Sequence, residues 1–331
     1  MDSFHKFTKK GNGKKAMIAF HGFNNDAEDL DDWLEDLPNY TVYVIDWDDK
    51  ATDSESGLEC PVADPDKWVA QFQQFLTENK IERFEILGFS LGARLAIEAA
   101  AANSEAVDRL WLLAPLGVIT NTWYFLGTWY PTRQLFRFFV KHPSRLAKFA
   151  SFCKRMKIIS EGRYRWQKYY SIKEPSALQK VYRSWQFCRK FSNNSDTWAK
   201  LSKVPLMLVA GTDDFVFTRD DFQSASNELN LRGLTVESLL LECGHNRLTG
   251  ELADWLVDRP DLEEIVEEES SAVTISLATE QEIQLKEEQM TTSTPVRGTA
   301  SSEREPELFR PSQANSLSNS NIRKMTTKPW R

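Results

Sequence analysis

The sequence is poor in the residues that hold metals or cross-link secreted proteins. It has four histidines and four cysteines, and the cysteines, at positions 60, 153, 188 and 243, follow neither a metal-ligand spacing nor a disulfide framework. No stretch approaches the roughly 18 apolar residues that a membrane-spanning helix needs. Residues 1–13 are polar and lysine-bearing, unlike a signal peptide. We expect a cytoplasmic protein without a membrane span and without a metal site.

A surplus of positive charge is also missing, because the 331 residues have a formal net charge of −7. Dedicated nucleic-acid binders are normally basic overall, so nucleic acid is not an expected partner. The length suffices for one large α/β domain with an insertion and a tail.

What the sequence does contain is a series of short apolar runs separated by helix-forming stretches. Continuous apolar runs, in contrast to alternating ones, indicate a mostly parallel sheet that helices cover on both faces. A turn signal, Gly11-Asn12-Gly13, separates residues 4–8 from the first run and predicts that the chain opens with a β-hairpin. The predicted strands cover residues 16–20, 40–46, 84–87, 107–113, 204–210 and 234–241.

The pentapeptide of residues 88–92, Gly-Phe-Ser-Leu-Gly, lies between an apolar run and the helix-forming run 93–100. A G-x-S-x-G sequence between a strand and a helix is typical of a nucleophile elbow. The turn is so tight that Ser90 would adopt a strained backbone, and the elbow glycines Gly88 and Gly92 would avoid clashes around it. Ser90 could instead be an ordinary helix N-cap.

Two further motifs follow predicted strands in the order that such an elbow would need. Asp213 and Asp214 come soon after the run 204–210, and His245 comes after the run 234–241. The order Ser, Asp, His differs from the orders in chymotrypsin and subtilisin. The two aspartates could instead form a turn or cap the next helix.

In order and register these motifs resemble those of the α/β-hydrolase superfamily over residues 1–257. The resemblance implies an α/β-hydrolase fold in which Ser90 attacks, His245 acts as the base and Asp214 orients the histidine. Asp214 is preferred because Gly-x-x-Asp is the superfamily spacing after this strand, and the adjacent Asp213 is the alternative acid.

The resemblance also implies an oxyanion hole formed by two backbone N–H groups. One belongs to Leu91, directly after the serine, and the other belongs to Phe23, two residues after His21. We expect His21 to shape this loop by hydrogen bonding and to take no part in the chemistry.

Residues 117–200 interrupt the alternation of strands and helices. They contain no convincing strand, are dense in aromatic residues, and carry 17 Lys and Arg against three Asp and Glu, a net charge of +14. They lie between two core strands, where hydrolases of this type carry a helical cap. We interpret them as a cap, or lid, over a hydrolase core of residues 1–116 and 201–257.

Residues 258–331 change composition again, from an acidic stretch to one dominated by Ser, Thr, Gln and Asn. Few large apolar residues remain to offset the entropy of ordering, so we expect this tail to be disordered.

These features predict a serine hydrolase that cleaves a carboxylic ester or thioester through an acyl-enzyme intermediate, without a cofactor. The expected partner is a small-molecule substrate with an apolar acyl group and an anionic part that the basic insertion could attract. An acyltransferase, a lyase or a haloperoxidase-like enzyme could use the same residues, and a non-catalytic binding scaffold is a further alternative. The sequence does not identify the substrate or the oligomeric state.

Overall fold

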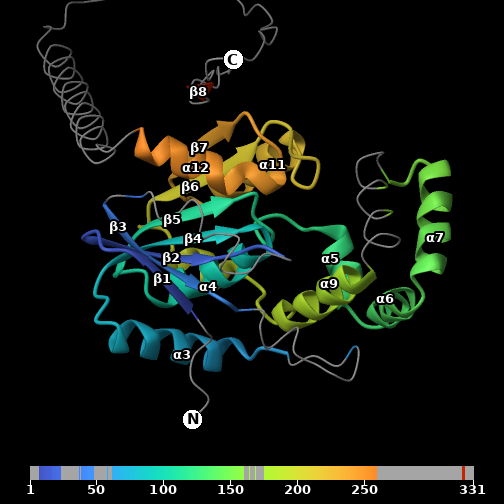
Figure 1. Cartoon of the computed structure of the whole chain (residues 1–331), viewed down its shortest axis with the longest axis horizontal. Coiled ribbons are helices and arrows are strands. Elements are labelled where there is room, and N and C mark those ends of the chain that lie inside the picture. Colours follow the sequence, from blue (N-terminus) through green and yellow to red (C-terminus); the bar gives the residue numbers. More distant parts are fainter. Residues whose placement is uncertain are drawn as a thin grey trace, which may run out of the picture. The chain divides into compact units, whose positions relative to one another are not determined.

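The protein is described by a computed structural model that covers residues 7–23, 37, 39–47, 58, 62–159, 164, 168, 175–258 and 323–324. An eight-stranded sheet runs through it in the order β1-β3-β2-β4-β5-β6-β7-β8 (Figure 1). Neighbouring strands are parallel except for β1 and β3. The strands are β1 Phe7–Gly11, β2 Lys15–Phe20, β3 Tyr40–Ile45, β4 Phe84–Phe89, β5 Val107–Leu113, β6 Leu206–Gly211, β7 Val236–Leu241 and β8 Arg323–Lys324.

The predicted parallel α/β sheet is confirmed, but the predicted N-terminal hairpin is wrong. β2 uses both of its edges for β3 and β4, so β1 pairs antiparallel with the remaining edge of β3. The connection after β1 passes closely over the start of β3, where the Gly13 N–H donates to the Tyr40 carbonyl. A Cβ on Gly13 would lie 2.1 Å from the Asn39 carbonyl carbon, so this crossing requires glycine.

The core lies between the sheet and the helices packed on it. Helix α4, Ala93–Ala102, packs against β2, β4 and β5, and α3, Pro65–Glu78, packs against α4. Helix α11, Arg219–Leu231, contacts β6 and β7, while α12, Leu248–Val257, contacts β7. Every residue of β4 and β6 is buried, as the continuous apolar runs predict.

Between β5 and β6 the described residues form helices and no strand. Figure 1 shows α5, α6, α7 and α9 gathered to one side of the sheet. We call residues 117–200 the insertion. The helices in its described residues are α5 Thr122–Thr128, α6 Thr132–Lys141, α7 Pro143–Arg155, α9 Pro175–Cys188 and α10 Ser195–Lys200.

Several expectations concern residues that the structure does not describe. The tail beyond Asp258 lies outside the described residues except for 323–324, and so does Cys60.

Cys153, Cys188 and Cys243 are free thiols. Within the described ranges, no helix has the length and apolarity needed to cross a bilayer, and no group of three or more His, Cys, Asp or Glu could hold a metal ion.

Candidate active site

The backbone at Ser90 is strained. Ser90 begins the short 3-10 helix Ser90–Gly92 directly after β4, and its φ angle of 51° lies in the left-handed region that serine rarely adopts. Such a conformation costs on the order of 1–3 kcal/mol and persists only where the surrounding structure holds it. Ser90 does not cap the following helix, because the N-cap of α4 is Gly92. This geometry is that of a strand-to-helix elbow.

The two elbow glycines are required by close packing. A Cβ on Gly88 would lie 2.5 Å from the Cα atom of Ala93, where α4 crosses β4. A Cβ on Gly92 would lie 2.4 Å from the carbonyl oxygens of Phe20 and His21. Neither glycine has a positive φ, so each is needed for space and not for its own backbone conformation.

Asp214 and His245 meet although 31 positions separate them in the chain. The Oδ2 atom of Asp214 lies 2.6 Å from Nδ1 of His245, and the aspartate side chain is fully buried. Its Oδ1 atom accepts hydrogen bonds from the backbone N–H groups of Val216, at 2.7 Å, and Phe217, at 2.9 Å. Asp213 is exposed. Of the two candidate acids, Asp214 is the one that contacts the histidine.

The aspartates do not cap the next helix. Thr218 is the N-cap of α11, and it forms a capping box with Asp221. The turn that Asp214 makes with Val216 and Phe217 therefore holds the carboxylate against Nδ1 of the imidazole.

His245 packs against the residue that precedes Ser90. The rings of Phe89 and His245 lie 5.0 Å apart between centroids. Because β4, β6 and β7 are parallel strands of one sheet, the residues that follow them share one edge. No hydrogen bond joins Ser90 and His245, both of which the structure describes; such bonds often tighten only when substrate binds.

The loop after β2 lies beside the elbow. A Cβ on Gly22 would lie 3.3 Å from the Cβ atom of Ser90, so the loop that carries Phe23 borders the serine. Leu91, the other proposed oxyanion donor, is buried in the first turn after the elbow. His21 is fully buried, with Nδ1 2.8 Å from the Gly22 carbonyl oxygen and its ring stacked on Trp47. These contacts shape the loop.

Cys243 is a buried residue of the loop that carries His245, and it contacts the loop that carries the aspartates. Its carbonyl oxygen accepts a hydrogen bond from the Asp213 N–H at 3.0 Å. Burial raises the pKa of its thiol to about 12, with a smaller contribution from Glu251. The thiol is therefore protonated at neutral pH, and a protonated thiol is a poor nucleophile.

A buried polar cluster joins α4 to the insertion, and the sequence reasoning missed it. Arg94 donates to the Phe191 carbonyl, and its guanidinium carbon lies 4.6 Å from the ring centroid of Tyr124. Glu98 accepts a hydrogen bond from the Asn193 N–H at 3.3 Å, and burial raises the pKa of its carboxyl. The available signal was an Arg and a Glu four residues apart in an otherwise apolar helix.

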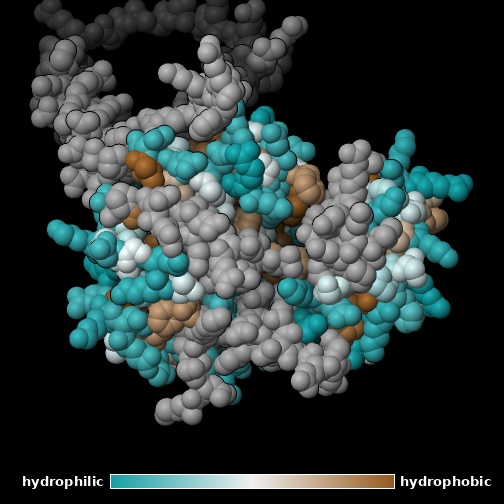
Figure 2. Space-filling view, viewed as in Figure 1, coloured by the Kyte–Doolittle hydropathy of each residue, from teal (hydrophilic) through white to brown (hydrophobic). Residues whose placement is uncertain are grey.

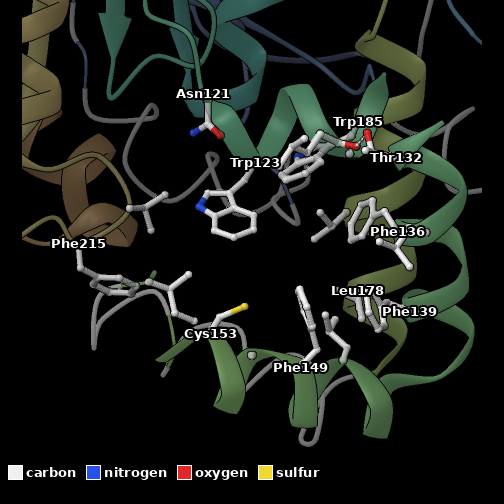
Figure 3. Close-up of a pocket in the computed structure, with 18 residues that line it drawn as sticks. Asn121, Trp123, Thr132, Phe136, Phe139, Phe149, Cys153, Leu178, Trp185 and Phe215 are labelled. Atoms are coloured by element: carbon white, nitrogen blue, oxygen red, sulfur yellow. Dashed lines mark hydrogen bonds between the residues drawn. The ribbon is translucent and has the colours of Figure 1, made fainter. Parts of the chain in front are cut away.

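A cavity of about 350 Å³ opens among α5, α6, α7 and α9. Figure 3 shows Phe149 and Cys153 projecting into it from one side, Trp123 and Trp185 from the other, and Phe215 at one end. None of the described residues that line it is charged. Phe215 and Val216 directly follow Asp214, so the wall of this cavity continues into the loop that holds the aspartate.

Comparison with known proteins places the chain in a family. The family model described as "Serine aminopeptidase, S33" (Hydrolase_4) matches residues 11–245. An esterase from Thermogutta terrifontis is similar in structure, with a TM-score of 0.53 and 14% identity over 80% of this chain and 93% of that one. For a bromoperoxidase from Bacillus anthracis the TM-score is 0.49, with 15% identity over 76% and 93% of the two chains.

A curated relative matches a shorter stretch. The dihydrolipoyllysine-residue acetyltransferase component of the acetoin cleaving system of Cupriavidus necator is 28% identical over 116 residues. This match covers 34% of this chain and 29% of that protein. The family model spans both the elbow and His245, and so the chain belongs to the Serine aminopeptidase, S33 family of α/β-hydrolases.

Proposed function

We propose that this hydrolase cleaves a carboxylic ester or thioester through an acyl-enzyme intermediate. Ser90 is the nucleophile, His245 the general base and acid, and Asp214 the group that orients the histidine. The backbone N–H groups of Phe23 and Leu91 hold the oxyanion. No metal or organic cofactor takes part.

The observation that supports the proposal most strongly is the 2.6 Å contact of Asp214 with Nδ1 of His245. A carboxylate on Nδ1 favours the tautomer whose proton is on that nitrogen, which leaves Nε2 free to take the serine proton. Ser90 then attacks the substrate carbonyl, and His245 returns the proton to the leaving alcohol or thiol. Water then attacks the acyl-enzyme in the same way, and the acid is released.

The insertion acts in this proposal as a cap over the site. Its apolar cavity suits an acyl group, because most of the described lining side chains are aromatic or aliphatic and only a few, such as Asn121 and Thr132, are polar. The basic side chains outside the cavity would attract an anionic part of the substrate. Closure of such a cap would exclude water while the acyl-enzyme forms.

The family description suggests an aminopeptidase as a second candidate. An aminopeptidase must bind the α-ammonium group of a peptide, and a buried cation needs a carboxylate or several oxygen acceptors. None of the described residues lining the cavity is acidic. We therefore favour esters and thioesters over peptides.

An acyltransferase would form the same acyl-enzyme and pass the group to an acceptor other than water. The partial match to an acetyltransferase component makes this a relevant competitor. Product analysis with p-nitrophenyl butyrate, in the presence and absence of an alcohol or thiol acceptor, distinguishes the two. Free butyrate as the main product in both conditions supports the hydrolase.

The test of the nucleophile is Ser90→Ala. We expect this variant to lose roughly 10⁵-fold or more in kcat on p-nitrophenyl butyrate, and to lose labelling by a fluorophosphonate probe. Ser202→Ala, which changes an exposed serine, is the matched control and should behave as the native protein. Turnover or labelling of Ser90→Ala at the native level would refute the assignment.

A further inference from the structure

The first half of the insertion has an unbalanced surface charge. Residues 117–159 contain eight Lys and Arg and no Asp or Glu. Protein surfaces normally intersperse both signs, so a stretch of this kind produces a positive field. The exposed cations in it are Lys141, Arg145, Lys148, Arg155 and Lys157.

Large apolar side chains lie among these cations on α7. Phe149, Phe152 and Met156 follow one another at spacings of three and four and therefore share one stripe of the helix. Phe152 is 56% exposed, Met156 57%, and Ile158, just beyond the helix, 62%. Several large apolar side chains exposed together mark an interaction site more often than an ordinary surface.

Basic residues border this stripe on the same helix. Lys148 lies four residues before Phe152, and Arg155 lies three residues after it, so both are its neighbours on the helix surface. Figure 2 shows apolar patches among polar ones over the part of the molecule where α6 and α7 lie. The surface thus pairs apolar side chains with cations.

The stripe also adjoins the cavity. Leu146, Ala150 and Cys153 line the cavity from the neighbouring face of α7, and Phe149 belongs to both the cavity and the stripe. In Figure 3 the side chains of Phe149 and Cys153 project from α7 into the cavity. A molecule seated on the stripe would lie at the rim of the cavity.

Aromatic residues of the interfacial type are exposed nearby in sequence. Trp129 and Tyr130 follow α5; the Trp129 ring stacks on Phe125 at 5.8 Å, and the Arg133 guanidinium lies over the ring of Tyr130. Trp and Tyr are enriched where proteins meet the headgroup region of a bilayer.

We propose that α7 and the residues after it, 143–158, form a peripheral binding surface for an anionic lipid bilayer. Lys148 and Arg155 contact the lipid phosphates, while Phe152, Met156 and Ile158 enter the headgroup boundary. A soluble acidic partner would satisfy the charges but would give these aliphatic and aromatic side chains no apolar phase to enter. The observations therefore favour the membrane.

Sedimentation of the full chain with lipid vesicles tests this proposal. We expect binding to vesicles that contain phosphatidylglycerol and little binding to phosphatidylcholine alone. At about 1 M salt, where charges are screened beyond ~3 Å, most of the binding should be lost. Failure of the native protein to bind the anionic vesicles overturns the proposal, and so does equal binding to both lipids.

Two variants test whether residues 143–158 form the surface that binds the vesicles. The double substitution Phe152→Asp and Met156→Asp should weaken binding at least about tenfold, because it removes apolar insertion and adds repulsion. Leu231→Asp, which changes a side chain 84% exposed on α11, is the matched control and should bind as the native protein does. Circular dichroism and urea midpoints verify that both variants fold. Equal binding by the double variant would show that 143–158 is not the surface.

Membrane binding can be tested independently of the reaction proposed above. Ser90→Ala should bind vesicles as tightly as the native protein, since Ser90 does not belong to this surface. If the native protein ignores vesicles but is retained on an immobilised acidic carrier protein, the surface serves a soluble partner and the membrane proposal is wrong.

Discussion

The carboxylate of Asp214 holds His245 with one oxygen and its own loop with the other. Oδ2 lies 2.6 Å from Nδ1 of the imidazole, and Oδ1 accepts two backbone hydrogen bonds from Val216 and Phe217. The group that would orient the histidine is thus fixed by the same turn that presents Phe215 and Val216 to the cavity.

Asp214→Asn should therefore lower kcat by about 10⁴-fold on p-nitrophenyl butyrate, because an amide on Nδ1 favours the wrong tautomer of the imidazole. Asp213→Asn is the matched control, since Asp213 is exposed and one position away, and it should remain close to native. If Asp213→Asn lowered kcat more than Asp214→Asn, Asp213 would be the residue that orients the histidine.

Replacing either elbow glycine by alanine should lower the stability of the protein, because the added Cβ atom would overlap neighbouring atoms. Gly88→Ala and Gly92→Ala each place a Cβ within 2.5 Å of backbone atoms, and we expect a loss of about 1–3 kcal/mol in the free energy of unfolding. Gly250 lies in α12 with nothing within 4 Å of the added Cβ. Gly250→Ala should instead stabilise the protein by about 0.5–1 kcal/mol. Urea denaturation measures all three, and stable elbow variants would contradict the packing argument.

The cavity should set a preference for longer acyl groups. Each buried methylene contributes about 0.8 kcal/mol, so kcat/KM should rise roughly fourfold per methylene from acetate until the cavity is filled. Cys153→Trp fills part of the cavity and should reduce octanoate turnover while leaving acetate turnover near native. Equal sensitivity of the two esters would mean that the acyl group binds elsewhere.

Stability should depend on pH through Glu98. Burial raises the pKa of this carboxyl in the folded state above the ordinary value of 4.5, so the folded protein binds the proton more tightly than the unfolded chain. Stability contributed by this group is therefore greatest below pH 4.5 and falls as pH rises through the folded pKa. Urea unfolding across this range should show a shallower decline for Glu98→Gln than for the native protein. Identical slopes would remove Glu98 as the cause.

The thiol of Cys243 should resist alkylation in the folded protein. With its pKa raised to about 12, only about 10⁻⁴ of it is thiolate at pH 8. Iodoacetamide followed by peptide mapping should leave Cys243 unmodified in buffer and label it fully in urea. Rapid labelling of the native protein would show that the loop containing this residue opens readily.

Much of the fold could be predicted because its signals are local. The apolar run 107–113 became β5 without change. The elbow and the loop motifs of Asp214 and His245 could also be predicted, since each is a short sequence that follows a strand. The pairing of β1 could not be predicted from the sequence. It depends on which strand edge remains free once all the other strands have paired.

By itself, therefore, the sequence determined the parallel α/β sheet, the order of Ser90, Asp214 and His245, and a basic aromatic insertion. Only the tertiary structure decided that Asp214 and not Asp213 contacts His245, that Arg94 and Glu98 join α4 to the insertion, and which side chains enclose the cavity. The physical reason is that periodicity specifies which face of an element is buried, whereas the neighbour it is buried against follows from packing elements that are distant in the chain.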